Sequence, residues 1–366
     1  MLSENERNIL RELTANPFIS QQELAKTIGL SRPAVANIIS GLTEKGYIVG
    51  RQYLLNYERF IICIGGANLD RTFRLQKEMK QESSNPVTGS ESFGGVARNV
   101  AENLGRLGCP VYLMTIVGDD RDGERLLFHA SSVMNIFMTE KTRMQNTGSY
   151  IAVLDPAGDL SVGFANMDIT DSMDAEWIQR HSNHLNLSDW ILCDCNVRKD
   201  AMEALVQRAR DRKSNLAIVG VSSSKMDRVP KDLEGVRILI CNREESMAYF
   251  DTVETSAEAL CRMWMETGVA AAVVTAGTEP FAAGDASGVG TYSVQAVAEE
   301  ELKSVTGAGD AFSAGILYGL IHGHSLEASL EYAKTLSRLT LQDAGSVRED
   351  ITRHRLLEET KLESLS

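Results

Sequence analysis

Short apolar runs alternate with longer amphipathic stretches along the chain after residue 60. The apolar runs have the length of buried strands, and several end in Gly, Asp or Asn: 61–67, 111–118, 149–155, 190–196, 216–222, 237–242 and 271–277. Segments such as 96–108 and 200–212 lie between them and have the 3.6-residue period of helices. Strands that alternate with helices predict an α/β fold with a mostly parallel sheet covered on both faces. Ligands bind such a sheet at the carboxyl ends of its strands.

Two segments depart from this pattern because polar and apolar residues alternate along them. They are 72–79 and 149–166, the second with a Pro-Ala-Gly-Asp turn at its centre. Alternation predicts strands with one solvated face. We therefore expect a small antiparallel sheet that projects from the main one.

The first 57 residues have a different, helical pattern. Residues 3–15 predict a helix that starts at Ser3, and Ser20 with Glu23 forms a capping box for a second helix that ends at Gly29. Ser31 begins a third helix, and residues 47–56 predict two short strands around a turn. Three helices followed by a β-hairpin describe a winged helix-turn-helix.

The segment 21–48, QQELAKTIGLSRPAVANIISGLTEKGYI, resembles bacterial regulators of the winged helix-turn-helix class. The resemblance implies that the third helix enters a DNA major groove. Its exposed residues would then be the DNA-binding ones: Ser31, Arg32, Asn37 and Ser40. The alternative is a helical appendage that packs against the rest of the protein or a second subunit.

Charge separates the two parts of the chain. The net charge is −13, yet residues 1–56 contain six basic and five acidic residues, which gives +1 for the head and −14 for the remainder. The body therefore does not suit nucleic acid, whereas the head weakly does. Six cysteines, a polar acidic N-terminus and no apolar run of roughly 20 residues favour a cytoplasmic protein without a membrane segment.

The chemistry is concentrated in residues 303–321, KSVTGAGDAFSAGILYGLI. Gly307, Ala308 and Gly309 are small enough for a phosphate to approach the backbone, and helical periodicity follows. A glycine turn at a helix N-terminus directs N–H groups at an anion, and Asp310 in that turn can accept a proton from a hydroxyl. Phosphoryl transfer needs these two elements. A plain helix cap would use the same residues.

This stretch resembles the second signature of the ribokinase-like (PfkB) carbohydrate kinases. Four further segments resemble that family in the same order: 64–71 (IGGANLDR), 93–108 (FGGVARNVAENLGRLG), 116–126 (IVGDDRDGERL) and 242–246 (NREES). The kinase resemblance implies a ribokinase-like domain with a β lid at 60–352 and a tail at 353–366, after the winged helix-turn-helix domain expected at 1–57. It also implies a homodimer, because the lid often pairs two subunits in this family.

The resemblance assigns roles to individual residues. Asp310 would be the catalytic base, with Gly307, Ala308 and Gly309 stabilising the transferred phosphoryl group of ATP. Asn242 and Glu245 would hold Mg²⁺ through water, and Thr275 and Gly277 would belong to the nucleotide loop. The substrate-binding residues would be Asn68, Asp70, Gly94, Gly95, Asn99 and Lys225.

Within the family, the chain resembles pseudouridine kinases and other nucleoside kinases. The resemblance lies in 84–105, 146–169, 194–197 and 221–225, and it implies transfer to the 5′-hydroxyl of pseudouridine. The sequence departs from the family pattern at Gly220-Val221 in place of an Asp-Pro, at Pro280 at a glycine position of the nucleotide loop, and at Ser304-Val305 before the second signature. A fourth departure is the N-terminal domain, which many kinases of this family lack. A kinase of ribose or a hexose, and a transcription regulator that uses the kinase-like body as a ligand sensor, stay open.

Overall fold

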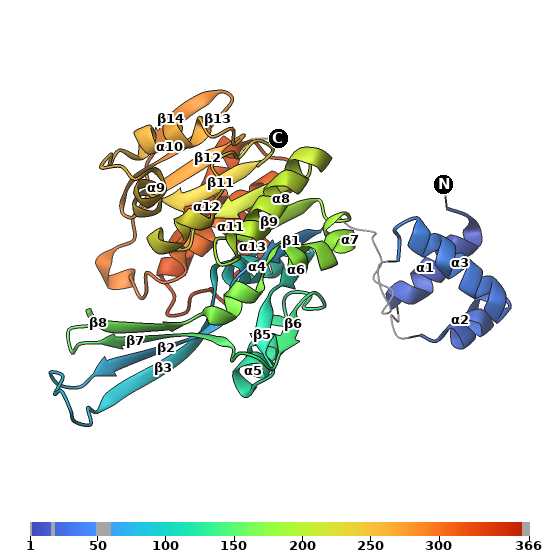
Figure 1. Cartoon of the computed structure of the whole chain (residues 1–366), viewed down its shortest axis with the longest axis horizontal. Helices are drawn as coiled ribbons and strands as arrows, with labels where there is room; N and C mark the ends of the chain where they lie inside the picture. The colour runs from blue at the N-terminus through green and yellow to red at the C-terminus, as the bar shows by residue number, and fades with distance from the viewer. Residues whose placement is uncertain (1, 16–18, 49–59, 361–366) are drawn as a thin grey trace. The chain divides into compact units, whose positions relative to one another are not determined.

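The computed structural model describes residues 2–15, 19–48 and 60–360, which fall into two compact units (Figure 1). One unit is Met1–Arg59 together with His181–Ser188, and the other is Phe60–Arg180 together with Asp189–Ser366. Each unit is built around its own hydrophobic core.

The head consists of three short helices with the predicted caps. They are α1 (Glu4–Ala15), α2 (Gln21–Ile28) and α3 (Arg32–Glu44). Ser20 and Glu23 form the capping box of α2, and Gly29 ends that helix in the left-handed region at φ 70°. Ser31 caps α3 by accepting a hydrogen bond from the Ala34 N–H at 3.3 Å.

The apolar faces of these helices form the head's core, which includes Leu10, Leu24, Val35 and Leu42. The four residues predicted to contact DNA are all exposed: Ser31, Arg32, Asn37 and Ser40. Most of the predicted hairpin, from residue 49 on, lies outside the described residues.

An eight-stranded sheet forms the centre of the larger unit, with strand order β14-β13-β12-β11-β10-β9-β1-β4. The strands from β4 to β12 in this order are parallel, and β13 and β14 add an antiparallel edge. Their bounds are β1 Ile61–Ile64, β4 Val111–Met114, β9 Trp190–Asp194, β10 Asn215–Val219, β11 Ile238–Asn242, β12 Ala272–Ala276, β13 Glu279–Asp285 and β14 Gly288–Tyr292. The predicted mostly parallel α/β sheet is confirmed.

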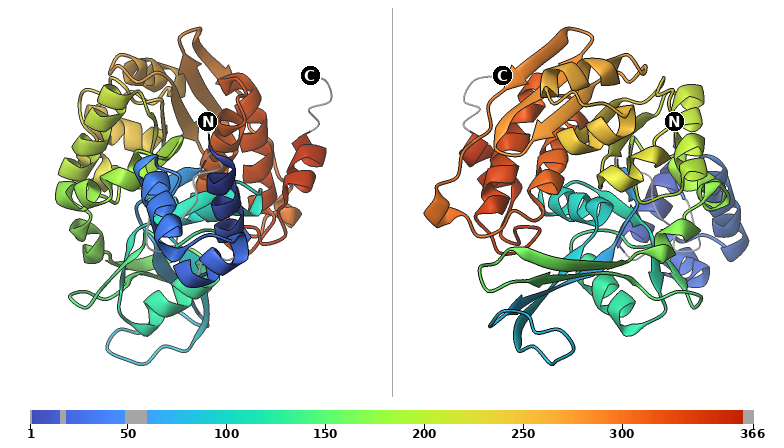
Figure 2. Two further views of the ribbon diagram at one scale, coloured as in Figure 1. Left: turned by 90° about the vertical axis from the view of Figure 1, so that its right-hand side faces the viewer. Right: turned by 60° about the vertical axis from the view of Figure 1, so that its left-hand side comes forward.

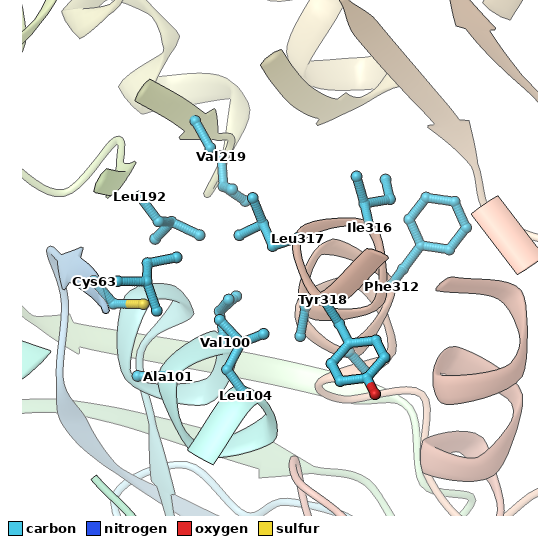
Figure 3. Packing of buried hydrophobic residues seen from close by; sticks show 14 of the residues in the cluster. Cys63, Val100, Ala101, Leu104, Leu192, Val219, Phe312, Ile316, Leu317 and Tyr318 are labelled. Carbon is cyan, nitrogen blue, oxygen red and sulfur yellow. The ribbon is translucent and has the colours of Figure 1, made fainter. Parts of the chain in front are cut away.

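Helices cover both faces of this sheet (Figure 2). One layer contains α4 (Val96–Arg106), α11 (Ala308–Ile321), α12 (Leu326–Leu341) and α13 (Arg353–Thr360); the other contains α6 (Ala175–Arg180), α8 (Lys199–Arg212), α9 (Arg243–Phe250) and α10 (Ala257–Met265). Val100 and Leu104 of α4 lie beside Leu317 and Tyr318 of α11 (Figure 3). The predicted tail begins with α13, whose Leu356 is buried in this core.

A four-stranded lid projects from the main sheet in the order β3-β2-β7-β8 (Figure 1). The strands are β2 (Asn68–Leu75), β3 (Val87–Gly94), β7 (Gly148–Leu154) and β8 (Leu160–Asn166). The lid exists as predicted, but it is not fully antiparallel, because β2 and β7 pair in parallel. The sequence pattern also missed β3, whose residues are mostly exposed and polar or glycine.

The segment 111–118, predicted as one strand, is two. β4 belongs to the main sheet, whereas β5 (Ile116–Gly118) pairs with β6 (Glu140–Thr142). After β5, Asp120 caps α5 (Arg121–Ala130) and also accepts two hydrogen bonds from Thr147, at 2.7 Å each. The segment 116–126 therefore joins the start of β7 to α5. Among the described helices, none has the length and hydropathy that a bilayer crossing needs.

Candidate active site

The glycine turn before α11 presents free N–H groups. Gly307 is the N-cap with φ 81°, and helical hydrogen bonding starts with the Ala311 N–H, which donates to the Gly307 carbonyl at 2.9 Å. The N–H groups of Ala308, Gly309 and Asp310 therefore have no helical acceptor. A Cβ at Gly307 would lie 1.9 Å from the Ser346 carbonyl oxygen, whereas one at Gly309 would meet nothing within 4 Å. The turn is packed on one side and open on the other, as an anion site requires.

Asp310 lies in the first turn of α11 and is held by Asn99 of α4. The Asn99 Nδ2 donates to Asp310 Oδ2 at 2.7 Å. Burial raises the pKa of Asp310 to about 7, with further raising by the charges of Asp194 and Asp70, while the Asn99 hydrogen bond and the charge of Arg98 lower it. A carboxylate with a pKa near neutrality is suited to general base chemistry.

A second pair of polar side chains stands on β2, where Asn68 Nδ2 donates to Asp70 Oδ1 at 2.5 Å. Burial raises the pKa of Asp70 to about 6. Gly94 is the register partner of Asn68, and a Cβ at Gly94 would lie 2.1 Å from Asp70 Oδ2. A glycine is therefore needed here so that the carboxylate can reach the site.

Gly95 lets two loops of the site meet. Its φ is 100°, and a Cβ there would lie 2.3 Å from the carbonyl oxygen of Gly66, in the loop after β1. Sequence reasoning placed Asn68, Asp70, Gly94, Gly95 and Asn99 in one site, and the structure brings them together where β2, β3 and α4 begin or end.

Asp194 joins the loop after β1 to the start of α4, and sequence reasoning did not identify it. It is fully buried at the end of β9 and accepts hydrogen bonds from the N–H groups of Gly66 at 3.0 Å and Ala97 at 2.9 Å. Burial raises its pKa. The available signal in the sequence was an Asp that ends a buried apolar run.

Lys225 reaches the same region through Asn196. Its Nζ donates to Asn196 Oδ1, and Asn196 Nδ2 donates to Asp194 Oδ2 at 2.9 Å. Burial lowers the pKa of Lys225, while the negative charge of Asp194 raises it. The lysine is therefore connected to the substrate loops through Asp194.

Asn242 and Glu245 form the capping box of α9. The Glu245 N–H donates to Asn242 Oδ1 at 2.8 Å, and the Asn242 N–H donates to Glu245 Oε2 at 2.9 Å. Burial raises the pKa of Glu245. A Cβ at Gly220 would lie 2.1 Å from Glu245 Oε2, which gives a physical reason for glycine at that departure from the family pattern.

The nucleotide-loop residues lie at the end of β12. Thr275 is the register partner of Asn242, and Gly277, with φ 64°, starts a two-residue turn into β13. Pro280 lies inside β13, opposite a register irregularity in β12, where its missing N–H is tolerated. The expectation that Pro280 lies in the loop itself is therefore wrong.

A cavity of about 230 Å³ connects this turn to α11. Apolar side chains dominate its lining, which includes Val297, Leu302, Val305 and Phe312, with Gly277 at its margin. Such a cavity beside an anion-binding helix end suits a planar base joined to phosphates.

The match to known families is decisive for the larger unit. The model of the pfkB family carbohydrate kinases matches residues 58–352. This chain belongs to that family. Its members are phosphotransferases that use an alcohol group as acceptor, and ATP use is supported by the family. A winged helix-turn-helix DNA-binding model matches residues 2–49 of this pfkB kinase.

Two relatives of the kinase have low sequence identity to this chain but match it over most of their own length. An uncharacterized sugar kinase of Escherichia coli, YeiI, is 26% identical over 91% of this chain and 92% of its own length. The pseudouridine kinase of E. coli is 27% identical over 77% of this chain and 90% of its own length. Among solved structures, a carbohydrate kinase from Agrobacterium tumefaciens has a TM-score of 0.70 and 26% identity, covering 83% of this chain and 97% of the other.

Proposed function

We propose that this pfkB kinase transfers the γ-phosphoryl group of ATP to the 5′-hydroxyl of a nucleoside, with pseudouridine as the preferred acceptor. The observation that carries the proposal is the pairing of Asp310 with Asn99 at the open N-terminus of α11, beside the Asp70–Asn68 pair. A base, an anion site and a set of hydroxyl-binding groups lie together there.

The transfer uses these groups in one displacement. Asp310 takes the proton of the acceptor hydroxyl while a bond forms between that oxygen and the γ-phosphorus, and the bond to the β-phosphate oxygen breaks to release ADP. The free N–H groups of Ala308 and Gly309 donate to the phosphoryl oxygens, whose charge they stabilise without reorganisation. Asp70 accepts hydrogen bonds from sugar hydroxyls.

Mg²⁺ fits the Asn242–Glu245 element as a water-mediated ion. In the described residues no group of three or more His, Cys, Asp and Glu side chains could hold a metal. Mg²⁺ commonly keeps several waters and binds one or two carboxylates together with substrate phosphates, so a single buried Glu245 suits it. When bound, the ion neutralises phosphate charge.

A nucleoside acceptor is favoured by relatives that act on nucleosides. Besides the pseudouridine kinase, they include the adenosine kinase of Saccharomyces cerevisiae, 27% identical over 81% of this chain, and the guanosine-inosine kinase of Exiguobacterium acetylicum, 27% identical over 66%. The sugar kinase YeiI favours the alternative of a free-sugar acceptor.

The acceptor is tested by measuring ADP release with pseudouridine, uridine, inosine, ribose and fructose 6-phosphate. We expect the highest kcat/KM with pseudouridine and a product phosphorylated at the 5′ oxygen. Faster turnover of ribose or fructose 6-phosphate would replace the nucleoside with a sugar. No ADP release with any acceptor would favour the ligand-sensor reading.

We propose two partners besides the substrate. The head binds DNA through the exposed α3 residues Ser31, Arg32, Asn37 and Ser40. The lid pairs two copies of the chain, because its edge strand β8 exposes Leu160 and Phe164, at 59% and 56%. Light scattering of the full chain tests the dimer, and a Phe164→Glu variant should be monomeric.

A further inference from the structure

Asn99 has a neighbour that determines which way its amide faces. Arg98 Nη1 donates to Asn99 Oδ1 at 2.7 Å, while Asn99 Nδ2 donates to Asp310 at 2.7 Å. A guanidinium has donors only, so the amide oxygen must face Arg98 and the amide nitrogen must face Asp310. Arg98 therefore fixes the donor that holds Asp310.

Arg98 is itself held by two groups besides Asn99. Its Nη2 donates to Glu102 Oε2, and its Nη1 also donates to the carbonyl of Phe93 at 2.8 Å, at the end of lid strand β3. The Phe93 carbonyl also accepts a hydrogen bond from Ser346 Oγ at 2.9 Å. Ser346 is the residue whose carbonyl oxygen lies against Gly307. Arg98 thus connects Asn99 to the end of lid strand β3 and, through the Phe93 carbonyl, to Ser346.

The ion pair behind Arg98 is buried. Its side chains are 3% and 1% exposed for Arg98 and Glu102. Arg106 also donates to Glu102 Oε1, at 2.9 and 2.6 Å, and His129 Nε2 lies 3.2 Å from the same oxygen. A buried ion pair adds little net stability, so stability alone does not explain the pair of Arg98 with Glu102.

We propose that Arg98 is a positioning residue for phosphoryl transfer: held by Glu102 and the Phe93 carbonyl, it orients the Asn99 amide toward Asp310 and supplies a positive charge that favours the ionised form of Asp310. The inference rests on the proposed role of Asp310 as base. It assigns a function to a residue that touches Asp310 only through Asn99.

The charge of Arg98 acts on Asp310 together with two carboxylates. Asp70 from β2 and Asp194 from β9 raise the pKa of Asp310, and Arg98 from α4 lowers it. Burial lowers the pKa of Arg98 to about 10, so it stays protonated at neutral pH. Removing this charge raises the pKa of Asp310. Since the base must be ionised, the acid limb of the kcat profile then moves to higher pH.

The test is the pH dependence of kcat for the full chain with ATP and pseudouridine, or whichever acceptor of the screen turns over fastest. We expect Arg98→Met to move the acid limb upward by about one pH unit. We also expect its plateau kcat to fall about tenfold or more, because Asn99 loses its fixed orientation. Arg98→Lys keeps the charge but not the planar guanidinium whose two nitrogens bond to Glu102 and to Asn99, so its limb should stay near the wild-type position while kcat falls.

Arg106→Met is the matched control. It removes the other arginine bound to Glu102 but has no contact with Asn99, so its acid limb should not move. If Arg98→Met folds and its kcat–pH profile keeps the acid limb of wild type, the inference is overturned. If Arg98→Met does not fold, a wild-type kcat in Arg98→Lys would overturn it. Full turnover in Asp310→Asn would instead overturn the base assignment itself.

Discussion

Burial of the ionisable Asp310 side chain lowers the stability of the folded protein. Its pKa rises to about 7 because burial and the carboxylates of Asp70 and Asp194 outweigh the Asn99 hydrogen bond and Arg98. A base with this pKa is ionised in a useful fraction at neutral pH and yet remains a strong proton acceptor. Function, not stability, explains a carboxylate at this position.

The stability of the kinase should therefore depend on pH through Asp310. Its folded pKa lies above the unfolded value, so the folded state binds the extra proton, and stability is lost as pH rises from about 4 to 7. Asp310→Asn removes this loss. We compare the unfolding free energy of the Asp310→Asn variant with that of wild type at two pH values. The variant should exceed wild type by about 2 kcal/mol more at pH 8 than at pH 5. Denaturant melts at the two pH values measure it, and equal gains would contradict the account.

Site residues that lie in a family motif could be predicted from the sequence, whereas the residues that hold them in place could not. The sequence predicted Asp310, Asn99 and Asp70 because the signatures 303–321, 93–108 and 64–71 contain them. Arg98 lies inside the segment 93–108 and bonds only to neighbours within five residues, but the sequence does not show that its guanidinium turns toward Asn99. Asp194 instead accepts hydrogen bonds from groups far away in the chain, the N–H groups of Gly66 and Ala97. No local pattern encodes those partners.

At the scale of elements, buried parallel strands were predictable and lid strands less so. A run such as 190–193 is apolar throughout and predicts a buried strand on its own. β3 is formed by Thr88, Gly89 and Ser90 among others, and it is a strand because β2 supplies its hydrogen-bond partners. The parallel pairing of β2 with β7 likewise joins strands that are far apart in the chain, which no local pattern encodes.

Two glycines of α11 should respond in opposite ways to the same change. A Cβ at Gly315 would lie 2.4 Å from the Cα of Ala333 in α12, so Gly315→Ala should destabilise the kinase by about 1–3 kcal/mol. Gly309→Ala meets open space and should leave the unfolding free energy unchanged or slightly raised, yet lower kcat because the methyl group enters the anion site.

Thermal melts and ADP release of both variants test this contrast. If Gly309→Ala kept the wild-type kcat, the open side of the turn would not be the phosphoryl site. If Gly315→Ala were as stable as wild type, the close approach of α11 and α12 would not be as tight as described.

At the scale of the whole molecule, charge and pattern divide the chain between a near-neutral head and an acidic body. The head matches a model of winged helix-turn-helix DNA-binding domains, and the body belongs to a family that phosphorylates alcohol groups. A protein that combines them would couple the level of a metabolite to transcription. That coupling requires that the head bind DNA at all.

We expect the full chain to bind a DNA fragment from upstream of its own gene, with affinity that falls as salt rises. Arg32→Ala should weaken binding and reduce the salt slope by about one, because one phosphate contact is lost. Fluorescence anisotropy between 50 and 200 mM salt, a range set by the usual salt dependence, measures both. Arg11→Ala, an equal charge change on α1, should have little effect. Absence of binding even at about 50 mM salt would favour the appendage reading.

The central claim is that Asp310 is the base that deprotonates the acceptor. Its most direct test is single-turnover phosphoryl transfer by Asp310→Asn, with acceptor and ATP binding measured on the same preparation by calorimetry. The account predicts a loss of at least about a thousandfold in the rate, since the isosteric amide cannot accept the proton, with both affinities within a few-fold of wild type. Turnover near the wild-type rate would contradict it.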